Sequence, residues 1–101
     1  MILNEIVQQL QTSTHPVAKS LHHNENCKVL CIGFKKGMLM KEHKTNLPAT
    51  LYIFDGEVVY KEGEKTQVLK KYEEIKIPVE KLHSVEARED SLCLLIQADE
   101  N

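Results

Sequence analysis

The stretch GMLMKEHKTNLPATLYIFDG, residues 37–56, decides the fold because strand-forming residues and turn-forming residues follow one another along it. Its second half, ATLYIFD, is rich in the β-branched and aromatic residues that favour strands. Asp55 and Gly56 then form a turn dipeptide, in which glycine readily adopts a positive φ. The stretch contains a single histidine, His43, six residues after Gly37. It predicts two strands that end in a tight turn, with one histidine on the first strand.

Apolar runs of the same kind continue on both sides of this stretch, as far back as Pro16. They predict strands near residues 17–23, 27–34, 38–45, 49–55, 57–61, 65–69, 74–77, 82–88 and 91–98. Many short strands separated by turn residues are typical of a sandwich or a barrel. The chain is therefore predicted to be all-β beyond its first residues.

The segment ILNEIVQQLQ, residues 2–11, differs from the rest because its apolar residues recur at helical spacing. It predicts one short N-terminal α-helix, which Pro16 separates from the strands. A helix of this length is unstable alone in water, so its apolar stripe must pack against another part of the structure. We expect a helix and linker over residues 1–16 and a barrel over residues 17–101.

Length, charge and cysteine content restrict the class of protein. A chain of 101 residues suffices for one domain with a modest core. Its formal net charge of -2 provides no field that would attract nucleic acid or an anionic membrane. The chain shows neither an apolar run of membrane-spanning length nor a signal-peptide pattern, and its cysteines lie in apolar stretches without metal or disulfide spacing. We therefore expect a cytoplasmic protein with reduced thiols, and no nucleic-acid or membrane partner.

Two motifs in this chain resemble those of the cupin family, which consists of small jelly-roll barrels. The first cupin motif is G-x5-H-x-H-x3,4-E-x6-G. Gly37, His43 and Gly56 match its glycines and its first histidine. Thr45 stands where the second histidine would be, and Ala49 stands where the glutamate would be. The first motif is thus present with two of its metal ligands replaced.

The second cupin motif, G-x5-P-x-G-x2-H-x3-N, is also partly present. Pro78 and His83 match its proline and its histidine. Tyr72 and Glu80 replace its glycines, and Ala87 replaces its asparagine. The chain is therefore identified as similar to a small, RmlC-like single-domain cupin with degenerate metal-binding motifs. The resemblance implies a double-stranded β-helix, that is, a cupin jelly-roll barrel, preceded by one short helix.

The resemblance also implies what the barrel interior contains. In the family, three histidines and one glutamate hold a divalent metal. Only His43 and His83 remain of the four ligands here, since a threonine hydroxyl is a poor neutral ligand and alanine has no donor. We expect no tightly held cofactor, and at most a divalent metal that His43 and His83 bind weakly. Three roles stay open for this pair: hydrogen bonding to water or backbone, contact with an organic ligand, and metal ligation.

Strand alternation adds further candidates to the site. Residues at i and i+2 on a strand share a face, so Lys41 is expected on the same face as His43, and Met40 on the opposite one. Lys41 would then face an anionic ligand at the barrel mouth or reach into solvent. The other expected ligand-binding residues are Thr45, Ala49, Leu51 and Ile53, the last two as an apolar floor.

The leading hypothesis is a cupin-fold protein that binds a small organic molecule and has largely lost its metal site. The alternative is a cupin enzyme, either a metal-dependent dioxygenase or a metal-free sugar isomerase or epimerase, that uses His43 and His83. No carboxylate lies at a spacing that would orient either histidine, so whether the protein is an enzyme stays open. A regulatory role is a third interpretation, and it would require a partner protein.

Strands that are apolar on both faces predict a homodimer. Residues 49–55 and 91–98 carry apolar side chains on both faces, and a barrel core covers only one of them. A short helix cannot easily cover the rest, and a large exposed apolar patch favours aggregation. We expect a two-fold symmetric dimer, to which Tyr52, Phe54 and the helix stripe of Ile6 and Leu10 are the candidate contributors.

Overall fold

The structure is a computed structural model that describes residues 2–98. One helix precedes a series of strands. In chain order the elements are α1 (Ile2–Leu10), β1 (Val17–His23), β2 (Cys27–Phe34), β3 (Leu39–His43), β4 (Ala49–Asp55), β5 (Glu57–Glu62), β6 (Lys65–Lys70), β7 (Glu74–Ile77), β8 (His83–Ala87) and β9 (Ser91–Ala98). The predicted all-β class and the predicted N-terminal helix are both confirmed.

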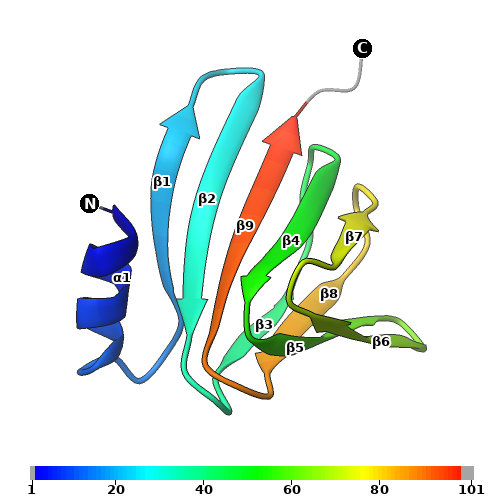
Figure 1. Ribbon diagram of the computed structural model, residues 1–101. Helices are drawn as coiled ribbons and strands as arrows, with labels where there is room; N and C mark the ends of the chain where they lie inside the picture. Colours follow the sequence, from blue (N-terminus) through cyan, green and yellow to red (C-terminus); the bar gives the residue numbers. More distant parts are fainter. Residues whose placement is uncertain (1, 99–101) are drawn as a thin grey trace.

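The strands form two antiparallel sheets, as expected for a jelly roll. The larger sheet has the order β1-β2-β9-β4-β7, and the smaller has the order β3-β8-β5-β6. Figure 1 shows β1, β2, β9 and β4 side by side, with α1 beside β1 at the edge of the larger sheet. Strands that are neighbours in a sheet are mostly distant in sequence, so a residue's neighbours across the strands cannot be read from sequence spacing alone.

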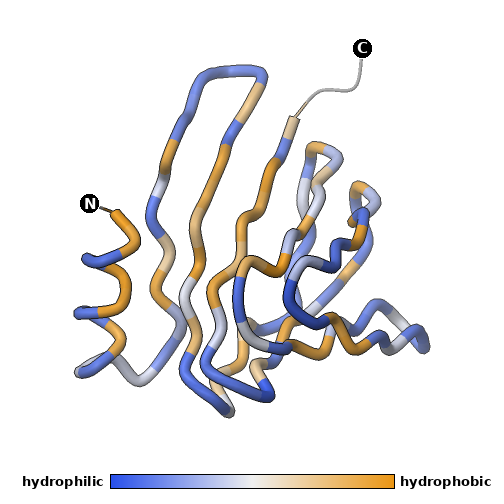
Figure 2. The backbone as a smooth tube through the Cα atoms, viewed as in Figure 1, coloured by the Kyte–Doolittle hydropathy of each residue, from blue (hydrophilic) through white to orange (hydrophobic). Residues whose placement is uncertain are grey.

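Apolar side chains from both sheets fill the space between them. The buried cluster draws residues from β2, β4, β5, β6, β7, β8 and β9. Alternation along β4 is clear, since Ala49, Leu51 and Ile53 are buried while Tyr52 and Phe54 are exposed. Figure 2 shows the apolar segments of β2 and β9 running through the middle of the larger sheet. The interior of the jelly-roll barrel is therefore filled by apolar side chains.

The helix packs against the outer face of the larger sheet. Ile6 and Leu10 are buried there with Cys31 of β2. Gly33 makes this contact possible, because a Cβ at that position would overlap Cγ2 of Ile6 and lie 2.8 Å from Cδ1 of Leu10. The expectation that the helical stripe must pack is confirmed. The expectation that Ile6 and Leu10 contribute to a dimer interface is wrong, because this contact buries them within one chain.

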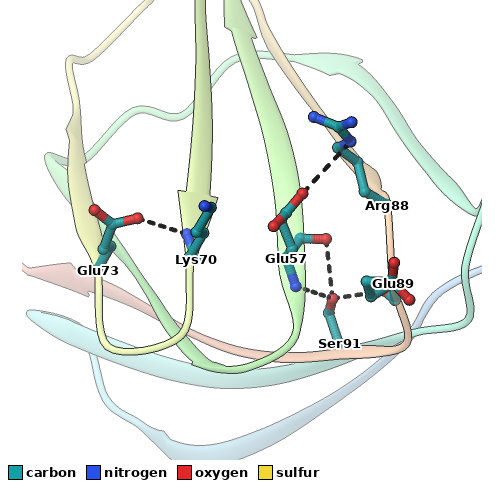
Figure 3. A network of polar contacts seen from close by, with 6 residues as sticks. All are labelled: Glu57, Lys70, Glu73, Arg88, Glu89 and Ser91. Carbon is teal, nitrogen blue, oxygen red and sulfur yellow. Dashed lines mark hydrogen bonds and ion pairs between the residues drawn. The ribbon is translucent and has the colours of Figure 1, made fainter.

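A polar network closes the end of the barrel where β5 begins and β8 ends (Figure 3). The backbone N–H of Glu57 donates to Oγ of Ser91 at 3.0 Å, and that hydroxyl donates to the carbonyl of Glu89 at 2.7 Å. Arg88 lies 3.5 Å from the Glu57 carboxylate. Gly56 adopts φ of 94° beside Ser91, where a Cβ would overlap the serine hydroxyl. The opposite end, where β3 ends and β8 begins, carries the histidines.

Two further expectations bear on the class of protein. No helix among residues 2–98 is long and apolar enough to cross a membrane. Cys27, Cys31 and Cys93 are free thiols, as expected from their spacing.

Candidate functional site

The barrel brings His43 and His83 into direct contact. His43 is the last residue of β3 and His83 is the first of β8, and the two are partners across the strands. Their ring centroids lie 4.2 Å apart, with the ring planes tilted by 56°. Two residues that are forty positions apart in the chain therefore form one site at the open end of the barrel.

Both imidazole rings are held in the same way by the backbone. Nδ1 of His43 lies 2.9 Å from the carbonyl oxygen of Lys41, and Nδ1 of His83 lies 3.0 Å from that of Lys81. A carbonyl oxygen can only accept a hydrogen bond, so Nδ1 is the protonated nitrogen of each ring. In the neutral rings Nε2 then presents a lone pair. The hydrogen bonds of the described residues engage only Nδ1 of each ring.

Burial keeps His83 uncharged. Its side chain is 1% exposed, and this burial lowers the pKa of His83 below its usual value because desolvation disfavours the imidazolium. The neighbouring His43 acts on the pKa in the same direction, while the Lys81 carbonyl and the Glu62 carboxylate oppose the shift. His83 is therefore an acceptor at neutral pH.

The cavity next to the two histidines is small. It has a volume of about 10 Å³, and apolar residues including Phe34 and Leu51 form most of its wall. Such a volume accommodates roughly one water-sized group. Ala49 and Ile53 are buried in the main core and do not line it. An organic molecule can therefore place only a small substituent beside the histidines in this conformation.

Thr45 contributes a buried hydroxyl near the same end of the barrel. Thr45 is 6% exposed, and within residues 2–98 its Oγ1 has no hydrogen-bond partner. Its carbonyl accepts a hydrogen bond from the N–H of Glu80 at 2.9 Å, which joins the loop after β3 to the loop before β8. A buried polar atom without a partner costs about 1–3 kcal/mol. Thr45 lines neither of the two cavities at this end of the barrel, so its expected place in the lining of the ligand site is not found.

The expected placement of Lys41 and Met40 is wrong, because β3 contains a bulge. Met40 pairs with Val85 and His43 pairs with His83, so β3 advances by one residue more than β8 between these pairs. The extra residue puts Met40 on the interior side with His43, where both line the small cavity. Lys41 lies outside, in a concavity of about 660 Å³ on the outer face of the smaller sheet.

Sequence reasoning missed Tyr60 and Glu62. The Tyr60 ring is fully buried and stacks on His83, with 5.9 Å between the centroids. Its hydroxyl donates to Oε1 of Glu62 at 2.7 Å. Glu62 pairs directly with His83 across the strands, although no carboxylate lies at a sequence spacing that would orient either histidine. Alternation from the buried Val58 through Tyr60 to Glu62 was the signal that could have found it.

A wider cavity lies at the mouth of the barrel, next to these residues. It has a volume of about 410 Å³. The residues that line it are Lys44, Glu62, Gly63, Glu80, Lys81 and Leu82. Two lysines and two glutamates balance in charge, so the mouth favours neither anions nor cations by its net charge.

The residues of this site do not fit a divalent metal. Within residues 2–98 no three His, Cys, Asp or Glu side chains come close enough together to hold a metal ion. The two motif positions that would complete the set carry Thr45 and Ala49. Two imidazoles alone leave too few protein ligands for a structural or a catalytic site.

Backbone conformation supports the alignment with both cupin motifs. Gly37 and Gly56, the two glycines of the first motif, have φ of 89° and 94°. Tyr72 and Glu80 stand where the second motif has glycines, and they have φ of 73° and 60°. Among the described residues they are the only non-glycine residues with positive φ. The left-handed conformation is therefore kept at all four positions, even where glycine is absent.

The fold and these motif positions together define a jelly-roll barrel similar to that of small, RmlC-like cupins. No protein-family model matches the chain, and no curated protein matches it in sequence. A cupin superfamily protein from Desulfitobacterium hafniense superposes with a TM-score of 0.81 and 16% identity, over 87% of this chain and 81% of that chain. An RmlC-like cupin from Desulfovibrio desulfuricans gives 0.77 and 23% identity, over 83% and 82%.

A cupin 2 conserved barrel domain protein from Leptotrichia buccalis is also similar. It superposes with a TM-score of 0.81 and 29% identity, over 87% of this chain and 43% of that longer chain. The similarity extends over most of this chain in every case, and it establishes the jelly-roll fold. The function must be argued from the site.

Proposed function

We propose that this chain is a cupin-fold protein that binds a small organic molecule through His43 and His83. The observation that carries the proposal is the shared orientation of the two rings. Each Nδ1 is engaged by a backbone carbonyl, which leaves Nε2 of each ring as an acceptor for a ligand. Two side chains fixed in advance lose little freedom on binding, which favours affinity.

The mouth cavity is the proposed place for the body of the ligand. Its volume of about 410 Å³ falls within the range of small-molecule sites. The cavity of about 10 Å³ beside the histidines would take one substituent, such as a hydroxyl group. Leu51 would form part of the apolar wall there, whereas Thr45 lines neither cavity. Lys41, on the outer face, has no part in this site.

The proposal includes a metal site that is largely lost. Only His43 and His83 remain of the motif ligands, and no third metal-binding side chain joins them within residues 2–98. A divalent ion would be held weakly by two imidazoles. The ligand would therefore meet nitrogen lone pairs directly.

Thermal shift measurements with a panel of small sugars, polyols and carboxylic acids test the proposal. A compound that stabilises the wild-type chain should lose its effect in His43→Gln and in His83→Gln. Lys41→Ala is the matched control, because its side chain lies outside the barrel and should leave the shift unchanged. Equal shifts in the wild type and in both histidine variants would overturn the assignment of the site.

A metal-free enzyme is the second candidate, and one observation favours it. His83 is held neutral with Nε2 available, beside a tyrosine and a glutamate, and a neutral imidazole can act as a general base. Deuterium exchange at a carbon of a bound ligand, lost in His83→Gln, would show proton abstraction. Binding without such exchange favours the binding protein.

We also propose that two chains associate through the outer face of the larger sheet. The outward positions of β2, β9 and β4 carry no charge over nine residues: Val29, Cys31, Gly33, Leu92, Leu94, Ile96, Thr50, Tyr52 and Phe54. The helix covers only part of this face. Phe54 is 49% exposed and Leu21 is 44% exposed beside an apolar groove of about 420 Å³. A second copy with the same face would bury both.

A further inference from the structure

Glu62 occupies a defined place beside the histidine pair. His43, His83 and Glu62 form one row across three adjacent strands, because His83 pairs with His43 on one side and with Glu62 on the other. Neighbouring strands are about 4.8 Å apart, so the row spans about 10 Å between its outer backbone positions. This length matches a small molecule with several polar groups.

Tyr60 holds the Glu62 carboxylate in place. The Tyr60 hydroxyl donates to Oε1 at 2.7 Å. Burial raises the pKa of Tyr60, and the hydrogen bond and the charge of Glu62 raise it further, so the phenol stays protonated and remains a donor. Oε2 has no hydrogen bond and Glu62 has no ion pair within residues 2–98. One oxygen is therefore fixed by the protein and the other is available.

The row presents acceptors to whatever lies against it. Nε2 of His43 and Nε2 of His83 carry lone pairs, and Oε2 of Glu62 carries negative charge. A carboxylate or phosphate placed there would meet acceptors only, and its own charge would face that of Glu62. A hydroxyl group donates a hydrogen bond and introduces no charge, so a molecule with several hydroxyls complements the row.

The charged residues of the mouth cavity favour neither a cationic nor an anionic ligand. Lys44 and Lys81 line it together with Glu62 and Glu80, and their charges balance. A ligand of either charge would meet two side chains of the same sign, whereas a neutral molecule meets no such repulsion. Both arguments select an uncharged ligand that is rich in donors.

We propose that Glu62 is a third ligand-contacting residue and that the row His43–His83–Glu62 selects an uncharged polyhydroxylated molecule over a carboxylate of the same size. This inference rests on the proposed function of the histidine pair. It assigns to the site a carboxylate from β5, which neither motif contains.

Saturation-transfer NMR with matched probes tests this inference. The probes are sorbitol against gluconate and glycerol against glycerate, each pair being similar in size and different in charge. The wild-type chain should bind each polyol at least about tenfold more tightly than its carboxylate, since a hydrogen bond to a charged group is worth about that factor. Failure of both polyols to bind, or tighter binding of the carboxylates, would overturn the inference.

Glu62→Gln is the decisive variant, because the amide keeps an acceptor for Tyr60 and replaces the other acceptor with a donor. The ratio of the affinity for each polyol to the affinity for its carboxylate should fall to about one, or below it. The melting curve measured by circular dichroism should not change. Lys41→Ala should keep the wild-type preference. An unchanged preference in Glu62→Gln would show that the carboxylate serves only Tyr60.

The outcomes separate this inference from the proposed function. If carboxylates bind the wild type and His43→Gln abolishes their binding, the histidine site stands and the ligand class is wrong. If the polyols bind equally well to the wild type and to both histidine variants, the site itself is wrong. Binding of Zn²⁺ that requires Glu62 would overturn the inference by making the row a metal site.

Discussion

Tyr72 and Glu80 share a left-handed backbone, with φ of 73° and 60°, at the two positions where the second cupin motif has glycine. A side chain in that region is strained against its own backbone, by about 1–2 kcal/mol per residue. The Tyr72 side chain is 80% exposed, so it makes no buried contact that would offset this strain. The protein is therefore less stable at this turn than a glycine would make it.

Replacement of Tyr72 by glycine should raise the free energy of unfolding by about 1 kcal/mol, because relief of strain outweighs the added freedom of the unfolded chain. Urea unfolding followed by circular dichroism measures the change. Glu64→Gly is the control, since Glu64 is an exposed turn residue without positive φ, and it should lose stability. A less stable Tyr72→Gly chain would contradict the argument.

Substitution of Gly33 by alanine should destabilise the chain by about 1–3 kcal/mol, because the new methyl group overlaps the β-branched side chain of Ile6. The effect should depend on the helix. In the background Ile6→Ala the same substitution should cost much less, which a double-mutant cycle would reveal as a coupling between the two positions. Additive losses would mean that the helix does not rest on β2 in solution.

Stability should depend on pH through His83. Its folded pKa is lowered below the unfolded value, so the unfolded chain binds more protons between these two values, and stability is lost as pH falls from about 6.5 through the folded pKa. The groups that face it are His43, Glu62 and Tyr60. Urea unfolding between pH 5.5 and 7.5 should show stability rising with pH, with a flatter profile in His83→Gln. A slope that is identical in this variant would exclude His83 as its source.

Light scattering at micromolar concentration should give about twice the chain mass of 11.6 kDa. Phe54→Glu should shift the mass toward that of one chain, because a charge would enter the uncharged outward positions of β2, β9 and β4. Val68→Glu is the matched control, since Val68 is an exposed apolar residue of the smaller sheet. A wild-type mass near that of one chain would refute the dimer.

Elemental analysis should find well under one equivalent of Fe, Mn, Zn or Ni per chain after purification without added metal. The reason is that Thr45 and Ala49 supply no strong donor where the motif has ligands. One tightly bound ion per chain would contradict the proposal, and it would require a protein ligand beyond His43 and His83.

The fold was largely predictable because its signals are local. Alternation in ATLYIFD, turn glycines such as Gly56, and helical spacing before Pro16 each depend on a few neighbouring residues. The site was less predictable, since its neighbours come from different strands. The bulge in β3 depends on how Met40 and His43 pair with β8, and no residue type in that segment predicts it.

Glu62 was missed for a related reason. The strand predicted over residues 57–61 ends before it, whereas the structure extends β5 through Glu62. Its place in the site depends on the hydrogen bond from Tyr60 and on its pairing with His83 on the adjacent strand. Neither relationship is visible until the order β3-β8-β5 of the smaller sheet is known.

Different hydrogen bonds secure the two ends of the barrel, which makes the chain suitable as a scaffold for new binding sites. The network around Ser91 secures one end, and the loops of residues 44–48 and 78–82 lie at the other. The hydrogen bond from Glu80 to the carbonyl of Thr45 ties those two loops together. A designer who exchanges them for loops of another specificity should therefore transplant them as a pair.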